Sequence, residues 1–98
     1  MSQSIFRALS DPNRRAILRL LTKKTMSAGE IASYFSLAKS TLSSHFNVLK
    51  NAGLIQEERN RTTVLYSINL SVVEEAIAAF MDLFGAGKPE NSVNREEK

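Results

Sequence analysis

The chain has 98 residues, contains no cysteine and carries a formal net charge of +3. This length favours a single domain, and the lack of cysteine excludes disulfides, thiolate metal ligands and thiol redox sensing. No apolar run reaches the roughly 20 residues that span a bilayer, and the N-terminal apolar stretch is too short for a secretory signal, so we expect a cytoplasmic protein.

The positive charge is concentrated in the first 70 residues, which hold ten Lys and Arg against four Asp and Glu, a net charge of +6. Residues 71–86 carry three acidic side chains and no basic one. A basic body suits a polyanionic partner, although a mixed, solvated surface would have the same totals.

Three helices are predicted in the first part of the chain. A short one holds Ile5, Phe6 and Leu9. A second begins at residues 11–12, because Asp caps free N–H groups and Pro suits the first helical position. A third begins at Ser27 with a capping box to Glu30, and its apolar face consists of Ile31, Ala32 and Phe35.

A fourth helix is predicted over residues 39–52, after a short break at residues 36–38. Leu42, Phe46 and Leu49 are offset by 0, 4 and 7 positions and form one apolar stripe. Gly53 stands where a C-terminal stop is expected.

The apolar pattern then changes to a period of two. Residues 54–59 and 63–69 read as two strands, and residues 59–62 form the tip between them. A last helix is predicted from Ser71, with a second capping box to Glu74. We assign residues 1–86 to one domain and residues 87–98, rich in polar side chains, to a disordered tail.

The predicted order, ααααββα, is that of a mainly α winged helix-turn-helix domain with a small β-hairpin. In such a unit the third and fourth helices form the helix-turn-helix pair. The second helix of this pair lies in the major groove of DNA, with an apolar inner face and an outer face of short polar groups. The fourth helix has this character and no acidic residue; its polar and basic side chains are Lys39, Ser40, Thr41, Ser43, Ser44, Asn47 and Lys50.

The polar face of this helix is suited to DNA, although a solvated face would also be polar. Its hydroxyl and amide groups can hydrogen-bond base edges or phosphates, and the Thr41 methyl can contact a thymine. Lys39 and Lys50 stand towards opposite ends, where they would meet backbone phosphates. His45, the single histidine, either contacts phosphate or is partly buried and bonded within the domain. A lone histidine is a poor metal site, so we expect no metal and no cofactor.

Arginines near the predicted hairpin tip and in the second helix are further candidates. Arg59 and Arg61 can reach phosphates or the adjacent minor groove, or they are simply solvated. Of Arg14 and Arg15, one can pair internally with an acid such as Asp11 and the other can face phosphate.

The first and last helices carry more apolar surface than a small core requires, which predicts a symmetric homodimer. The alternative is that both helices only cover the monomer's own core. The candidate interface residues are Ile5, Phe6, Leu9, Ile77, Phe80, Met81 and Phe84. A two-fold dimer would read an inverted repeat in double-stranded DNA, with half-sites about one DNA turn (roughly 10 bp) or a multiple apart.

The sequence resembles the ArsR/SmtB family of bacterial repressors. The resemblance lies in three stretches, residues 8–18 (ALSDPNRRAIL), 40–55 (STLSSHFNVLKNAGLI) and 64–68 (VLYSI). It implies a dimeric winged-helix repressor whose terminal helices pair, with Ser40, Thr41, Ser43, Ser44 and His45 at DNA-recognition positions.

The chain departs from the metal-sensing members of that family. It lacks their cysteines near the third helix, at residues 26–31, and their histidines on the last helix. It is more similar to the metal-independent autorepressors of the SdpR type. That resemblance implies repression of its own operon, relieved by a partner such as a sequestering membrane protein.

The sequence argues against two other classes of function. A protein-interaction module would show acidic or bulky apolar side chains on the outer face of the fourth helix, and the sequence has the opposite. An enzyme is not expected, because the chain has no paired carboxylates at a suitable spacing and no phosphate-binding glycine loop.

Overall fold

A computed structural model describes residues 3–85. Its elements in chain order are α1 (Gln3–Leu9), α2 (Pro12–Leu21), β1 (Met26–Ser27), α3 (Ala28–Ala32), α4 (Lys39–Asn51), β2 (Ile55–Asn60), β3 (Thr63–Ile68) and α5 (Leu70–Leu83). This is the expected winged helix-turn-helix arrangement with one strand added, β1. The tail expected over residues 87–98 lies outside the described residues.

Two helix starts follow the side-chain capping that the sequence predicts. The Asp11 carboxylate accepts from the backbone N–H groups of Asn13 at 2.7 Å and Arg14 at 3.2 Å, which fixes the start of α2. At α3, the Ser27 hydroxyl accepts from the Glu30 N–H at 3.0 Å, and the Glu30 carboxylate accepts from the Ser27 N–H at 2.9 Å. Both bonds of a capping box are present, so this prediction is confirmed.

The predicted start of the last helix is wrong. Helix α5 begins at Leu70 with Asn69 as its N-cap residue, and no side chain caps it. The Ser71 hydroxyl instead donates to the Asn69 side-chain oxygen at 3.1 Å. Ser71 therefore lies inside the helix, and the capping box with Glu74 does not form.

Helix α3 is shorter than its apolar pattern indicates. It ends at Ala32, and Phe35 lies in the turn that follows, where its N–H donates to the Ala32 carbonyl at 3.1 Å. Phe35 still packs against the core as a partly buried side chain. The apolar spacing identified a core contact, but not a helical residue.

Helix α4 ends as the sequence predicts, at a glycine with left-handed backbone. Gly53 has φ +78°, and its N–H donates to the Lys50 carbonyl at 2.9 Å. The N–H of Leu54 donates to the Leu49 carbonyl at 3.0 Å. These two bonds form a Schellman motif, which turns the chain directly into β2.

The sheet has three antiparallel strands in the order β1-β3-β2. The pairing of Asn60 with Thr63 leaves a two-residue loop, and its first residue, Arg61, has φ 59°. Strand β1 pairs Met26 with Tyr66. The sequence analysis missed this strand, because two residues are too few to show a period.

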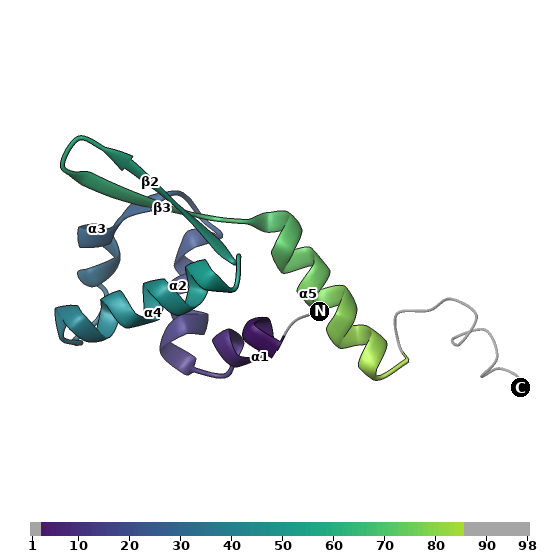
Figure 1. Ribbon diagram of the computed structural model, residues 1–98. Coiled ribbons are helices and arrows are strands. Elements are labelled where there is room, and N and C mark those ends of the chain that lie inside the picture. The colour runs from purple at the N-terminus through teal and green to yellow at the C-terminus, as the bar shows by residue number, and fades with distance from the viewer. Residues whose placement is uncertain (1–2, 86–98) are drawn as a thin grey trace, which may run out of the picture.

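The core lies where α2, α3, α4 and the sheet meet. Its fully buried large side chains are Ile17, Ile31, Leu49 and Leu54. Helix α5 adds only Ala76 to the buried set. Figure 1 shows α5 on one side of the body and the β2–β3 hairpin projecting from the other side, so the two predicted functions, dimerisation and DNA contact, fall on different parts of the molecule.

Candidate nucleic-acid interface

Helix α4 is held on the body by one face. Leu42, Phe46 and Leu49 are buried, as their spacing predicts. The Phe46 ring lies 4.5 Å from the ring of Tyr66 on β3, measured between centroids. This contact fixes the orientation of the helix relative to the hairpin, which matters because both are expected to meet the same DNA.

The opposite face of α4 is open to solvent. The residues predicted to contact DNA that lie exposed on it are Lys39, Ser40, Thr41, Ser43, Ser44 and Asn47. None of the 13 residues of α4 is acidic. The residue before the helix, Ala38, has no side-chain hydrogen bond to the first turn. A helix end of this kind favours anions such as phosphate.

His45 lies on the buried side of α4 rather than on this exposed face. It is 8% exposed, and its Nδ1 lies 3.2 Å from a guanidinium nitrogen of Arg14. A guanidinium can only donate, so Nδ1 is the acceptor in this contact. Of the two alternatives for His45, the structure shows the buried, internally bonded one.

Arg14 joins three parts of the domain. Besides His45, its guanidinium donates to the carbonyl of Ala8 at 2.9 Å and to that of Arg7 at 3.0 Å. It thereby links the end of α1 to the buried side of α4. The Arg14 guanidinium is thus bonded to two carbonyls and a histidine. Asp11 accepts a hydrogen bond from the backbone N–H of Arg14 and none from its guanidinium. Arg15 donates to the Leu9 carbonyl at 2.8 Å.

The hairpin carries the two predicted arginines at its outer end. Arg61 is exposed at the loop, and Arg59 is 73% exposed on β2. Arg59 is not free, because its Nε lies 3.4 Å from Oε2 of Glu57. The other oxygen of that carboxylate lies 2.6 Å from Nζ of Lys50 on α4. Glu57, which the sequence analysis did not single out, therefore contacts two of the predicted phosphate ligands.

A second surface lies on α1 and α5, away from the hairpin. The exposed large apolar side chains of α5 and of the residue that follows it are Leu70, Ile77, Phe80, Met81, Leu83 and Phe84. Of the α1 candidates for the dimer interface, Ile5 is 7% exposed and belongs to the monomer core. Phe6 is half-buried and its ring centroid lies 6.1 Å from that of Phe80. Leu70 and Leu83 are exposed members that the sequence analysis did not include.

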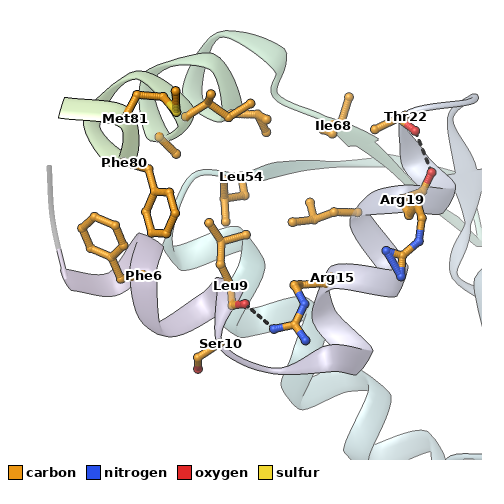
Figure 2. Close-up of a pocket in the computed structure, with 14 residues that line it drawn as sticks. Phe6, Leu9, Ser10, Arg15, Arg19, Thr22, Leu54, Ile68, Phe80 and Met81 are labelled. Atoms are coloured by element: carbon orange, nitrogen blue, oxygen red, sulfur yellow. Dashed lines mark hydrogen bonds between the residues drawn. The ribbon is translucent and has the colours of Figure 1, made fainter. Parts of the chain in front are cut away.

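A cavity of about 600 Å³ lies between α1, α2, α5 and the sheet. Figure 2 shows Phe6 and Phe80 at one end, Leu54 in the middle and the guanidinium groups of Arg15 and Arg19 on the other side. The lining is mainly apolar, which indicates that α5 alone does not fill the space beside the body.

Within residues 3–85, no three His, Cys, Asp or Glu side chains gather in a group that could hold a metal ion. No helix in that range is both long and apolar enough to cross a bilayer.

Comparison with known proteins decides the family. The model of the family described as bacterial regulatory protein, arsR family, matches residues 11–57. The transcriptional repressor SdpR of Bacillus subtilis is 38% identical over 84 residues, which cover 86% of this chain and 93% of SdpR. The chain belongs to the ArsR family.

Solved structures agree with this assignment. A crystal structure of an ArsR family transcriptional regulator has a TM-score of 0.72 and 28% identity, covering 85% of this chain and 94% of its own. The structure of NolR from Sinorhizobium fredii has a TM-score of 0.68 and 30% identity, covering 86% and 84%. The present chain, as a member of the ArsR family, is thus a DNA-binding transcription regulator with a winged helix-turn-helix fold, and not an enzyme.

Proposed function

We propose that this ArsR regulator is a homodimeric repressor that binds an inverted-repeat operator in double-stranded DNA. The observation that carries the proposal is the exposed face of α4, with its hydroxyl, amide and lysine side chains and no acidic group. Short side chains let a helix approach base edges closely in the major groove. Acidic groups on that face would repel phosphates.

The exposed residues of α4 are assigned different contacts according to the length of their side chains. We assign base-edge or phosphate hydrogen bonds to Ser40, Thr41, Ser43, Ser44 and Asn47, and a backbone phosphate to Lys39. On the hairpin, exposed Arg61 lies in the loop between the strands, where a phosphate or the minor groove would be within reach. His45 is left out of the direct contacts because it is buried and bonded to Arg14.

We propose that α1 and α5 form the dimer interface. Five large apolar side chains of α5, and that of Phe84 directly after it, are at least 42% exposed in the single chain. Burying them against a second copy would stabilise the assembly and would cover the mouth of the cavity beside α5. A two-fold dimer would present two α4 helices to half-sites about one DNA turn (roughly 10 bp) or a multiple apart.

The direction of regulation rests on the named relative. SdpR is called a transcriptional repressor, and we propose that this chain likewise represses transcription, including that of its own gene, without a metal ion and in the cytoplasm. The sequestering membrane protein that the resemblance implies stays a prediction. The alternative, a protein-interaction module, lacks support on α4, whose outer face is neither acidic nor bulky and apolar.

The test is a fluorescence anisotropy titration of the metal-free protein with the DNA upstream of its own gene and with an unrelated duplex, at two salt concentrations. We expect the upstream DNA to bind far more tightly, with an affinity that falls steeply in salt. Equal, weak binding to both duplexes would contradict an operator in that DNA. Failure to bind any DNA would favour the interaction module.

The recognition helix is tested by a double variant, T41A with S44A. Each good base contact contributes about 1–3 kcal/mol of discrimination, so preference for the operator should fall by about tenfold or more while binding to unrelated DNA changes little. S71A, which removes a hydroxyl from exposed Ser71 on α5, is the matched control. A double variant with unchanged preference would show that Thr41 and Ser44 do not read the bases.

A further inference from the structure

Five side chains from three elements gather where the end of α4 lies against the hairpin. Glu57 of β2 pairs in register with Tyr66 of β3, so both side chains lie on one face of the sheet. Tyr66 packs on Phe46 of α4, and Lys50 lies one turn further along the same side of that helix. Arg59, two residues after Glu57, shares its strand face.

Glu57 makes one short and one longer ion pair in this cluster. The Glu57 carboxylate uses one oxygen for Lys50 Nζ at 2.6 Å and the other for Arg59 Nε at 3.4 Å. The side chain of Glu57 is 18% exposed and that of Lys50 34%. Partial burial strengthens such an ion pair relative to one in water. Glu57 thus engages one cation of the recognition helix and one of the hairpin.

The carboxylate of Glu57 is ionised at neutral pH, because its pKa lies below the ordinary value of 4.5. The hydrogen bond from Lys50 is the main cause that lowers the pKa of Glu57, and the positive charges of Lys50 and Arg59 act in the same direction. Burial, and then the charge of Glu57, raises the pKa of Tyr66. The cluster therefore holds a fixed negative charge beside the surface that carries the predicted phosphate contacts.

We infer that Glu57 limits sequence-independent DNA binding by holding Lys50 and Arg59 in ion pairs with which phosphates must compete. This rests on the proposed function, because it assumes that α4 and the hairpin face DNA. Binding to unrelated DNA is almost entirely a matter of neutralised phosphates. Two cations engaged by a protein carboxylate contribute less to that binding than two free ones, whereas base contacts from Thr41 or Ser44 are unaffected.

The chain contains a matched control for the test. Glu58 is exposed, alternates to the other face of β2 and takes part in none of these contacts. E57Q and E58Q each remove one negative charge from neighbouring positions. The general effect of net charge on DNA affinity is therefore common to both variants, and only the release of Lys50 and Arg59 distinguishes them.

The measurement is the affinity for an unrelated duplex over a range of salt, by fluorescence anisotropy, for wild type, E57Q and E58Q. We expect E57Q to bind about threefold to tenfold more tightly than E58Q. The slope of log affinity against log salt should steepen by about 1 to 2, since each phosphate contact contributes about 0.9. Adding K50M to E57Q should remove about half of this extra slope.

The inference would be overturned if E57Q had the same affinity and salt slope as E58Q, or if E57Q bound the unrelated duplex more weakly than E58Q. Weaker binding would show that Glu57 orients the cations towards DNA or supports the hairpin, and a thermal melt of E57Q separates these two. If wild type prefers the upstream DNA but E57Q matches E58Q, only the role of Glu57 fails. If wild type binds no DNA, the proposed function fails and the inference falls with it.

Discussion

Phe80 offers the most direct test of the proposed dimer. It lies on α5 and is 49% exposed, although it is one of the largest apolar side chains in the chain. Its ring centroid lies 6.1 Å from that of Phe6 on α1 and 5.6 Å from that of Phe84. Phe80 is therefore central to the apolar surface that α1 and α5 form together, and F80A removes the ring with little effect on helix formation.

The expected effect on dimerisation follows from the exposed area. A buried phenylalanine covers about 200 Å², so the exposed half leaves about 100 Å² for a partner to cover. At about 25 cal/mol per Å² this is about 2.5 kcal/mol per copy, and a two-fold interface counts it twice. Alanine keeps part of this area and coverage is incomplete. We therefore expect a loss of about 3 kcal/mol, which weakens the dimer about 100-fold.

Sedimentation equilibrium over a wide range of protein concentration measures the dimer constant directly. Tyr34 provides the control, because it is 62% exposed and lies outside α1 and α5. Y34A should leave the constant within about threefold of wild type. Circular dichroism of F80A should show unchanged helix content, so that a loss of dimer is not a loss of fold.

Two results would refute the reasoning. If F80A leaves the dimer constant unchanged, the exposed face of α5 is not the interface. If Y34A weakens the dimer more than F80A, the second copy binds elsewhere. A wild type that stays monomeric at every concentration would contradict the homodimer itself.

Three further predictions concern stability. D11A removes the two hydrogen bonds that cap α2 and should cost about 1 kcal/mol in urea unfolding; an unchanged midpoint would show that water replaces the cap. R14M leaves His45 and two carbonyls without their donor and should cost about 2–4 kcal/mol, and a loss below 0.5 kcal/mol, on the order of an ordinary surface substitution, would contradict the link to α4. The folded-state pKa of Glu57 is lowered, chiefly by Lys50, so its ion pairs stabilise the fold fully above the unfolded value of 4.5 and less as pH falls through the folded value. Thermal midpoints of wild type and E57Q should therefore differ at pH 7 and converge in acid, and a constant difference would contradict this.

The sequence alone determined the features that depend on near neighbours. The caps at Asp11 and Ser27 and the stop at Gly53 act within a few residues, so their side-chain or backbone chemistry is readable directly. The apolar stripe of α4 repeats with the helical period, so its buried face and its polar outer face were both predictable. The family resemblance was also readable from the sequence, because it lies in three continuous stretches of residues.

Only the tertiary structure decided features that join distant segments. Strand β1 exists because Met26 pairs with Tyr66, and two residues alone carry no pattern. His45 is adjacent in sequence to the exposed Ser44, yet it is buried, and its hydrogen-bond partner there is Arg14, 31 residues away. Glu57 looked like an ordinary charge on a strand until the fold placed Lys50 and Arg59 on its two oxygens.

The apolar surface on α1 and α5 was determined partly by the sequence and partly by the tertiary structure. The apolar spacing of α5 predicted a buried face, but it could not say whether the partner was the chain's own body or a second copy. The fold leaves Phe80 and Ile77 about half exposed and places Ile5 in the core. Burial depends on which atoms surround a side chain, whereas the sequence specifies only that burying an apolar side chain away from water is favourable.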